Sequence, residues 1–378
     1  MKKYLISLCI AVIVLAGVAS ATYADRNSAE QGLRRVLARS EGDATAAEKA
    51  GCRLARRAHA LRAYVCSRNA ADALGFPEDI RVFAHDVNAN AQVKANMVHS
   101  AGNIGAGRKV AVIDTGYNYL HPELSSSYVG GIDLVNDDSD PFDDNGHGSH
   151  VAGIITADGV SANAKGAAPE AGVVAVKALD VNGTGFFSDI IAGIYWVVDG
   201  PDGIATTSDD WNADAINMSL GSGAPYLYKG FCDTVYPEMT SAIKYAKSRG
   251  TLVVVAAGNS GRTGVSLPGC IGDATTIGAV DSKNKIASFS GRGTAVDLVA
   301  PGVNLYAPVL GSGYATWSGT SMATPVASAV AALVRYAHPG WTSAQIESAM
   351  FSTAQDLGTA GKDKVFGWGL VNAWFSVQ

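Results

Sequence analysis

The feature that most constrains the fold is an alternation of short apolar runs with stretches of helical periodicity. The apolar runs are rich in β-branched residues and end in turn formers: Lys109–Gly116 (KVAVIDTG), Val173–Asp180 (VVAVKALD), Ala215–Gly221 (AINMSLG), Thr251–Asn259 (TLVVVAAGN) and Thr275–Asp281 (TTIGAVD). Helical patterns occur at His147–Thr156, Ser188–Val198, Pro237–Arg249 and Ser321–Ala337. Strands that are apolar on both faces need cover on both faces. The alternation therefore predicts an α/β protein with a mainly parallel sheet and helices on both sides.

Residues 1–24 have the pattern of a secretory signal peptide. They begin with MKK, continue with an apolar run over residues 4–18 and end in the small-residue sequence ASATYA. The apolar run is short for a membrane span, and no other segment of the chain is long enough. We expect cleavage after Ala21 or Ala24, export of the protein and no membrane association once the signal is removed.

Residues 25–87 differ in character from the rest of the chain. They are rich in Ala, Arg and Glu, and the pattern predicts a helix at Ala47–Ala63 and an extended piece at Ile80–Ala84. The small polar sequence DVNANA at residues 86–91 indicates a linker to a larger domain over residues 88–378.

Charge divides the chain in the same place. Residues 1–85 carry 13 Lys and Arg against 8 Asp and Glu, whereas residues 86–378 carry 16 against 26. The two parts should attract each other, as expected for two domains of one precursor. The acidic bulk of the larger part argues against nucleic-acid binding.

The cysteines fit an oxidising compartment. Cys9 leaves with the signal, Cys52 and Cys66 lie in the early segment, and Cys232 and Cys270 lie far downstream. An even number in each region predicts one disulfide in each. No Cys-x-x-Cys pair or Cys/His cluster with zinc-ligand spacing occurs in the sequence.

Four polar residues stand where the predicted strands end or the predicted helices begin. Asp114 ends VIDTG, Asn259 ends AAGN, His147 opens the helix after DNG, and Ser321 opens the helix of SGTSMATP. Function gathers at the carboxyl ends of the strands in such a sheet. The expected place for Pro325 is the first turn of its helix, where a missing N–H costs nothing.

Each of these residues has an ordinary structural role when it is taken alone. Ser321 and His147 fit helix caps, and Asp114 and Asn259 fit turn formers. Taken together, they supply a nucleophile, a general base, a carboxylate to orient the base and a donor for an oxyanion. That set indicates an acyl-transfer site.

Four segments resemble the signature segments of the subtilisin-like serine proteases: VAVIDTG, DNGHGSHVAGII, VVVAAGN and SGTSMATPVASAVAAL. They occur in the family's order, Asp then His then Ser. The similarity runs from Val93 to Ala373 and includes a closing GWGLVNA. The resemblance implies the family's α/β fold, a triad of Asp114, His147 and Ser321, and an oxyanion donor at Asn259. It also makes residues 88–378 the catalytic domain and residues 25–87 an inhibitory, chaperone-like prosegment.

The resemblance implies an S1 pocket as well. Ser219-Leu220-Gly221 and Ala256-Ala257-Gly258 are similar to its two walls, and Ser266 falls at its floor. With small walls and no acidic group, this pocket should accept a large apolar P1 side chain and disfavour Lys or Arg.

Further contacts follow from the same resemblance. The segment Gly183-Thr184-Gly185 is similar to the edge that pairs with an extended substrate as an added strand. Phe187, Ile190 and Leu220 are expected to line an apolar S4 site, although such side chains also occur in an ordinary core.

The chain departs from short family members at several positions. The acidic loop Gly200–Trp211 and the stretch Ala224–Pro237 are additional or longer. Glu123 stands where the resemblance implies a calcium-ligand aspartate, and the loop Asp158–Ala164 has the length of a calcium loop but carries Val160 at a ligand position. We expect a structural Ca²⁺ with Glu123 and Asp158 as candidate ligands, and the complete ligand set stays open.

The predicted function is a secreted, monomeric serine endopeptidase of broad specificity, with polypeptide substrates and its own prosegment as intramolecular inhibitor. A processing convertase that cuts after paired basic residues is one alternative. It would need acidic S1 and S2 pockets. Asp143 and Asp144 lie near His147, but no acidic residue follows Ser219 until Asp233. A second alternative is an inactive homologue that serves as a binding or inhibitory module. It would have lost a triad residue, and none is lost.

Overall fold

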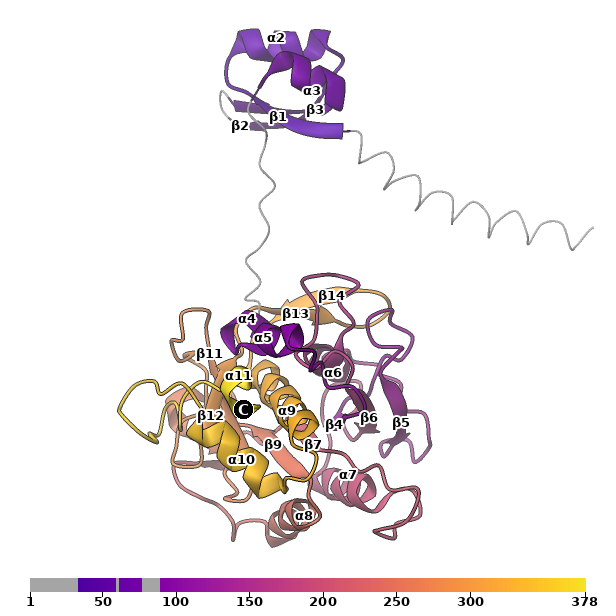
Figure 1. The fold of residues 1–378 in the computed structure, drawn as a ribbon, viewed down its shortest axis with the longest axis vertical. Helices are drawn as coiled ribbons and strands as arrows, with labels where there is room; N and C mark the ends of the chain where they lie inside the picture. Colours follow the sequence, from indigo (N-terminus) through magenta and orange to yellow (C-terminus); the bar gives the residue numbers. More distant parts are fainter. Residues whose placement is uncertain (1–32, 59–60, 77–88) are drawn as a thin grey trace, which may run out of the picture. The chain divides into compact units, whose positions relative to one another are not determined.

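A seven-stranded sheet forms the centre of the larger of two compact units in the computed structural model, which describes residues 33–58, 61–76 and 89–378 (Figure 1). The strand order is β12-β11-β9-β7-β4-β6-β5, and all neighbouring strands pair in parallel. The strands are β4 (Lys109–Asp114), β5 (Tyr128–Asp133), β6 (Gly172–Lys177), β7 (Ala215–Met218), β9 (Leu252–Ala256), β11 (Thr275–Val280) and β12 (Leu298–Pro301). The five strands predicted from the sequence are confirmed, and the two edge strands β5 and β12 are additional.

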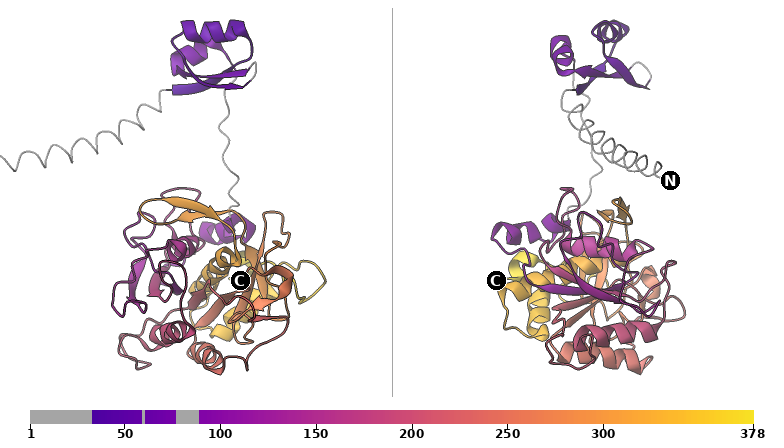
Figure 2. Two further views of the ribbon diagram at one scale, coloured as in Figure 1. Left: turned by 180° about the vertical axis from the view of Figure 1, so that it is seen from behind. Right: turned by 90° about the vertical axis from the view of Figure 1, so that its right-hand side faces the viewer.

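Alternate residues of each strand enter two separate cores, because successive side chains of a strand point to opposite faces. In β4, Val110 and Val112 join one cluster and Ala111 and Ile113 join the other. The first cluster is covered by α6 (His147–Thr156) and α9 (Thr320–Ala337), and the second by α7 (Phe187–Asp199) and α8 (Pro237–Ser248). The two further views show helices on both sides of the sheet (Figure 2). The predicted α/β architecture is confirmed.

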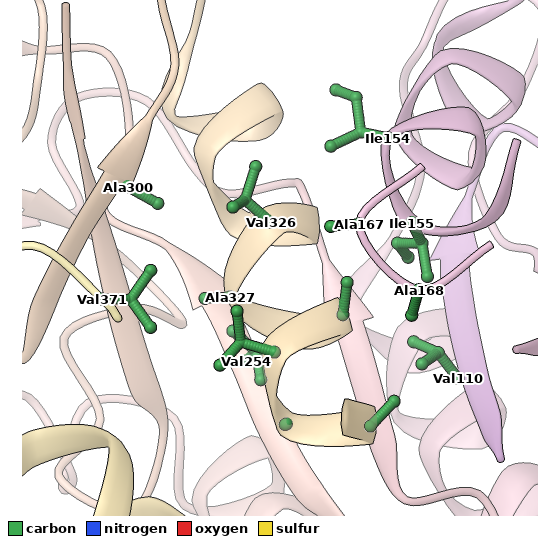
Figure 3. Packing of buried hydrophobic residues seen from close by; sticks show 14 of the residues in the cluster. Val110, Ile154, Ile155, Ala167, Ala168, Val254, Ala300, Val326, Ala327 and Val371 are labelled. Atoms are coloured by element: carbon green, nitrogen blue, oxygen red, sulfur yellow. The ribbon is translucent and has the colours of Figure 1, made fainter. Parts of the chain in front are cut away.

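Helix α9 lies in the middle of the first core and is buried along most of its length. Its many alanines allow its backbone to approach the sheet closely, so that neighbouring valines and isoleucines fill the space around it. Figure 3 shows Val326 and Ala327 of α9 in one cluster with Val254 of β9, Ala300 of β12 and Ile155 of α6. This packing fixes the helix whose first turn carries Ser321.

Shorter elements surround the two cores. The helices are α4 (Ala89–Gln92), α5 (Ala95–Ser100), α10 (Ser343–Ser352), α11 (Ala373–Ser376) and a 3₁₀ turn at Gly261–Thr263; the two-stranded pieces are β8 (Leu227–Tyr228) with β10 (Val265–Ser266), and β13 (Leu305–Pro308) with β14 (Tyr314–Trp317). A disulfide joins Cys232 to Cys270, with a Cα–Cα distance of 5.4 Å. The predicted pairing in the downstream region is confirmed.

The predicted linker at residues 86–91 is wrong over its second half. Ala89, Asn90 and Ala91 belong to helix α4, and Asn90 is buried. Its side-chain amide donates to the carbonyls of Lys165 (2.8 Å) and Gly166 (3.1 Å). A small polar composition indicated a linker, but here the polar side chain satisfies loop carbonyls that burial would otherwise leave unpaired.

The described part of the smaller unit, residues 33–58 and 61–76, is an antiparallel sheet in the order β1-β3-β2 with two helices. Its elements are β1 (Leu33–Ala38), α2 (Glu41–Lys49), β2 (Arg53–Ala58), β3 (Leu61–Ser67) and α3 (Arg68–Leu74). The predicted disulfide between Cys52 and Cys66 is present and lies in the unit's small core. A core of this size gains much of its stability from such a cross-link.

The predicted helix at Ala47–Ala63 is wrong. A capping box formed by Ser40 and Asp43 starts α2 earlier than expected, and the chain leaves the helix at Gly51, whose φ of +75° favours glycine. The residues that follow form β2 and the start of β3. The predicted signal peptide and the extended piece at Ile80–Ala84 lie outside the described residues. No helix in the described part of the chain is long and apolar enough to cross a membrane.

Candidate active site

Asp114 is the last residue of β4 and is fully buried at the carboxyl edge of the sheet. Its Oδ1 accepts a hydrogen bond from the backbone N–H of Thr115 (2.8 Å) and lies 2.7 Å from Nδ1 of His147. A carboxylate in this position makes Nδ1 the protonated nitrogen of the imidazole, which leaves Nε2 free to act as a base.

Asp143 holds His147 in place beside Asp114. Its buried carboxylate accepts hydrogen bonds from the N–H groups of Asn145, Gly146 and Ser149, from the Ser149 hydroxyl (2.6 Å) and from the Thr115 hydroxyl (2.9 Å). Burial alone would raise the pKa of Asp143. The hydrogen bonds from Gly146, Ser149 and Asn145 outweigh it and hold the pKa below its ordinary value. The start of α6 is thereby fastened to the residue that follows Asp114.

Two glycines allow this close approach. A Cβ on Gly148 would lie 2.2 Å from the carbonyl oxygen of Gly116, and a Cβ on Gly116 would lie 2.6 Å from the carbonyl oxygen of Pro141. Any side chain at either position would therefore separate the helix from the strand end.

Two opposing effects set the pKa of the His147 imidazole. Burial lowers its pKa, but the charge of Asp114 and its hydrogen bond outweigh burial and raise the pKa above the ordinary value. The ring of Trp317 lies parallel to it at 6.3 Å and also stacks on His150 at 4.5 Å. Burial lowers the pKa of His150 to about 4, so this second histidine stays neutral behind the site.

Ser321 is the second residue of α9, as predicted for a residue at a helix N-terminus. The expectation that Pro325 lies in the first turn is wrong, because the helix begins at Thr320 and Pro325 lies inside it. The carbonyl of Ser321 instead accepts a hydrogen bond from the hydroxyl of Ser219 (2.7 Å).

Asn259 lies in the loop after β9, next to the start of α9. Its Oδ1 accepts from the N–H (2.9 Å) and the hydroxyl (3.0 Å) of Thr320, whose hydroxyl in turn accepts from the N–H of Gly258 (3.1 Å). With Oδ1 occupied in this way, the Nδ2 amide donates to no acceptor among the described residues. This amide is the group that the oxyanion role requires.

A cavity of about 860 Å³ brings His147, Ser321 and Asn259 together. Ten of the eleven predicted substrate-binding residues also line it: Gly183, Gly185, Phe187, Ile190, Ser219, Leu220, Gly221, Ala256, Gly258 and Ser266. Ala257 does not line it. Ala257 belongs to the second core, and its backbone bonds to Ile277 and Ser266.

Ser266 lies between the two predicted walls of the S1 pocket. A Cβ on Gly258 would lie 2.0 Å from its Oγ, and a Cβ on Gly221 would lie 3.0 Å from its Cβ. A side chain at Gly258, whose φ is +86°, would therefore displace Ser266, whereas one at Gly221 would require only a small shift of Ser266.

The predicted substrate edge at Gly183–Gly185 is not part of a strand in this structure. Asp180 closes a turn by accepting from the N–H groups of Asn182 and Thr184. A Cβ on Gly185 would lie 2.2 Å from the carbonyl oxygen of Ala178, so the segment lies close against the sheet.

The two carboxylates considered for a basic-specific site are both engaged. Asp143 is buried in the network described above. Asp144 pairs with Lys177 (2.7 Å), whose ammonium also donates to the carbonyls of Thr115 and Leu179. Neither leaves an unpaired negative charge for a basic substrate side chain.

Asn145, Phe186, Thr320 and Trp317 contribute to the site without having been predicted. The first three line the cavity, and the ring of Trp317 stacks on that of His147. Phe186 is 75 % exposed, which is unusual for an aromatic side chain. Its exposure indicates a contact residue only when its neighbours in the fold are known.

Glu123 does not fit the calcium role that the resemblance implies. Its carboxylate is buried and accepts from the N–H groups of Gly159 (2.7 Å), Val160 (3.0 Å) and Ser161 (2.6 Å), and from the hydroxyl of Tyr314 (3.0 Å). The positive ends of these donors point at the carboxylate oxygens of Glu123. A calcium ion would have to bind at the same oxygens.

The second candidate calcium ligand, Asp158, is exposed and contacts a neighbouring hydroxyl. Both oxygens of Asp158 accept from the hydroxyl of Ser126, at 2.8 and 2.7 Å. Among the described residues, no group of three or more His, Cys, Asp or Glu side chains is arranged to hold a metal ion. Backbone amides balance the charge of Glu123. The Glu123 carboxylate in turn holds the loop that follows Asp158.

The chain is similar to known proteins over most of its larger unit. The sequence profile of the subtilase (peptidase S8) family matches residues 105–369. The chain is 40 % identical to subtilisin BL of Lederbergia lenta over 282 residues, which cover 75 % of this chain and 95 % of that protein. It is 41 % identical to the M-protease of Shouchella clausii (75 % and 67 % covered) and 38 % identical to subtilisin E of Bacillus subtilis (76 % and 70 % covered).

The chain belongs to the subtilase family, and it is a serine endopeptidase.

The charge of Asp114 should be visible in the pH dependence of activity. Only neutral His147 can act as a base, so kcat/KM should fall on the acid side around a pKa above the ordinary value of about 6.5. Asp114→Asn removes the charge that raises this pKa. The acid limb should move to lower pH while kcat falls by about 10⁴-fold.

The control for this measurement is His99→Gln. His99 lies on α5 and its ring nitrogen contacts the carbonyl of Ala167, so the acid limb should not move. An acid limb that keeps its position in Asp114→Asn would contradict the assignment of the limb to the Asp114–His147 pair.

The stability of a Glu123 variant distinguishes Glu123 as an acceptor for the loop amides from Glu123 as a calcium ligand. Glu123→Gln places an amide group against backbone donors and should cost about 1–3 kcal/mol of unfolding free energy. The exposed Glu170→Gln is the matched control and should leave the Tm unchanged. Thermal unfolding is measured in a Ser321→Ala background to prevent autolysis, with and without a chelator. If the chelator lowers the parent Tm and Glu123→Gln abolishes that effect, Glu123 is a calcium ligand after all.

Proposed function

We propose that this chain is the precursor of a secreted endopeptidase in which Asp114, His147 and Ser321 hydrolyse peptide bonds by acyl transfer. The observation that carries the proposal is the 2.7 Å contact between Asp114 and His147 beside a cavity that Ser321 and Asn259 also line. His147 takes the proton of the Ser321 hydroxyl as it attacks the peptide carbonyl, and returns it to the leaving amine. The N–H of Ser321 and the Nδ2 amide of Asn259 donate to the oxyanion that forms.

Substrate preference follows from the pocket. Ser266 and the neighbouring glycines offer a narrow, uncharged slot, while Asp143 and Asp144 are already engaged. A buried Lys or Arg would have no partner there, whereas a large apolar side chain gains from leaving water. Phe187, Ile190 and Leu220 line the same cavity and add an apolar P4 preference.

The smaller unit is the proposed prosegment. The basic charge of the early segment, the separate disulfide-linked fold of residues 33–58 and 61–76 and the signal-like start of the chain support a precursor that matures outside the cell. The prosegment inhibits the enzyme until the enzyme itself cuts the chain between Ala84 and Val93. The mature enzyme is a monomer that acts on polypeptides.

The specificity proposal is tested with succinyl-Ala-Ala-Pro-X anilides. Values of kcat/KM should be highest with Phe, Leu, Tyr or Met at X, about ten- to hundredfold above Ala, because burying such a side chain contributes about 1.5–3 kcal/mol. Arg and Lys should be poor. A preference for Arg or Lys over Phe and Leu would overturn the pocket assignment and favour the convertase.

Maturation is tested with the nucleophile removed. Ser321→Ala should be exported as a full-length proform, because the cut that releases the catalytic unit is made by the enzyme itself. N-terminal sequencing of the secreted protein is the measurement, with Ser343→Ala as a matched serine control that matures normally. Normal processing of the Ser321→Ala protein would show that another protease makes the cut.

A further inference from the structure

The helix that carries Ser321 lacks one of its backbone hydrogen bonds. In an α-helix the carbonyl of each residue accepts from the N–H four positions later. For Ser321 that position is Pro325, which has no N–H. The carbonyl of the proposed nucleophile therefore needs a donor from outside the helix, because a buried backbone acceptor is rarely left without a partner.

Ser219 supplies that donor. Its hydroxyl lies 2.7 Å from the Ser321 carbonyl oxygen, and the residue is 3 % exposed. Ser219 directly follows strand β7 and belongs to the wall of the proposed S1 pocket. The bond thus joins the pocket wall to the first turn of α9, across 102 positions of sequence.

Two further buried side chains fix the direction of this bond. The amide of Asn217 donates to the Ser219 oxygen (3.0 Å), and its carbonyl oxygen accepts from the hydroxyl of Ser328 (2.9 Å). Because Ser219 already accepts from Asn217, its single proton is free for the Ser321 carbonyl. A chain of donors runs from Ser328 through Asn217 and Ser219 to Ser321, and each bond strengthens the next.

We propose that Ser219 is a positioning residue for the nucleophile, its hydroxyl replacing the N–H that Pro325 lacks. It holds the peptide plane that follows Ser321, and so fixes the direction of the Ser321 hydroxyl within the site. This inference rests on the proposed role of Ser321. It adds that the pocket wall and the nucleophile are held in register by one hydrogen bond.

The first experiment measures the nucleophile apart from the pocket. A small fluorophosphonate without a P1 side chain reacts with Ser321 but does not fill S1. Ser219→Ala should be labelled about tenfold more slowly, and kcat on a Phe anilide should fall about tenfold with KM little changed. The separate variant Ser219→Thr keeps the hydroxyl and should be labelled at close to the rate of the parent enzyme.

A matched control separates positioning from simple loss of a buried hydroxyl. Ser343 is also 3 % exposed, and its hydroxyl donates to the carbonyl of Lys247 (3.0 Å), in helix α8. Ser343→Ala should lower the Tm but label at the parent rate. A labelling loss as large as that of Ser219→Ala would overturn the proposal.

The second experiment returns the missing donor. Pro325→Ala restores an N–H that can reach the Ser321 carbonyl, so the hydroxyl of Ser219 should become dispensable. In the Pro325→Ala background, Ser219→Ala should slow labelling by only about twofold, which a double-mutant cycle reports as coupling between the two positions. Equal losses in both backgrounds would refute the proposal.

Folding failure would also be informative. If Ser219→Ala alone is not recovered, a folded and labelled Ser219→Ala/Pro325→Ala protein supports the inference, and an unfolded one refutes it. Failure of the parent enzyme to label at Ser321 would refute the proposed function instead, because the parent enzyme still contains Ser219.

Discussion

The buried carboxylate of Asp143 is the interaction on which the site depends. It accepts five hydrogen bonds and so fastens the first turn of α6 to Thr115, the residue after Asp114. The sheet places Asp114 and the helix places His147, but neither element by itself brings the two within hydrogen-bond distance. The many donors offset the cost of burying this carboxylate and leave the backbone of the two segments little freedom. The orientation of the His147 ring is therefore set before any substrate binds.

The sequence was sufficient for most of the sheet because its central strands are buried on both faces. Runs such as Thr251–Asn259 must be apolar throughout, and few structures besides a covered parallel sheet produce that pattern. The edge strands carry weaker signals. β5 contains Gly130 and Gly131, and β12 ends at Pro301, all residues that are depleted in strands. The false helix at Ala47–Ala63 had helix-forming composition, but a capping box and Gly51 decided where α2 begins and ends.

The position of a candidate site residue was predictable where the residue stands in a sequence motif, and its surroundings were less so where they depend on residues distant in sequence. Asp114, His147, Ser321 and Asn259 lie in motifs at strand ends or helix starts. Asp143 was considered only as a charge for basic substrates, because nothing in the sequence indicates the five donors that surround it. Glu123 was expected to bind calcium, whereas the amides of Gly159, Val160 and Ser161 surround it. Donors from a folded loop cannot be read from residue types.

Lys177 can serve as a chemical probe of whether the larger unit is folded. Its side chain is 1 % exposed, and the ammonium is held by Asp144 and by the carbonyls of Thr115 and Leu179, directly behind the active site. An amine-reactive reagent can modify surface lysines of the intact enzyme, but it reaches Lys177 only when the strand ends next to Asp114 have opened. Acylation of Lys177, followed by peptide mass spectrometry, therefore counts the molecules whose active-site framework has come apart, whatever state the rest of the chain is in.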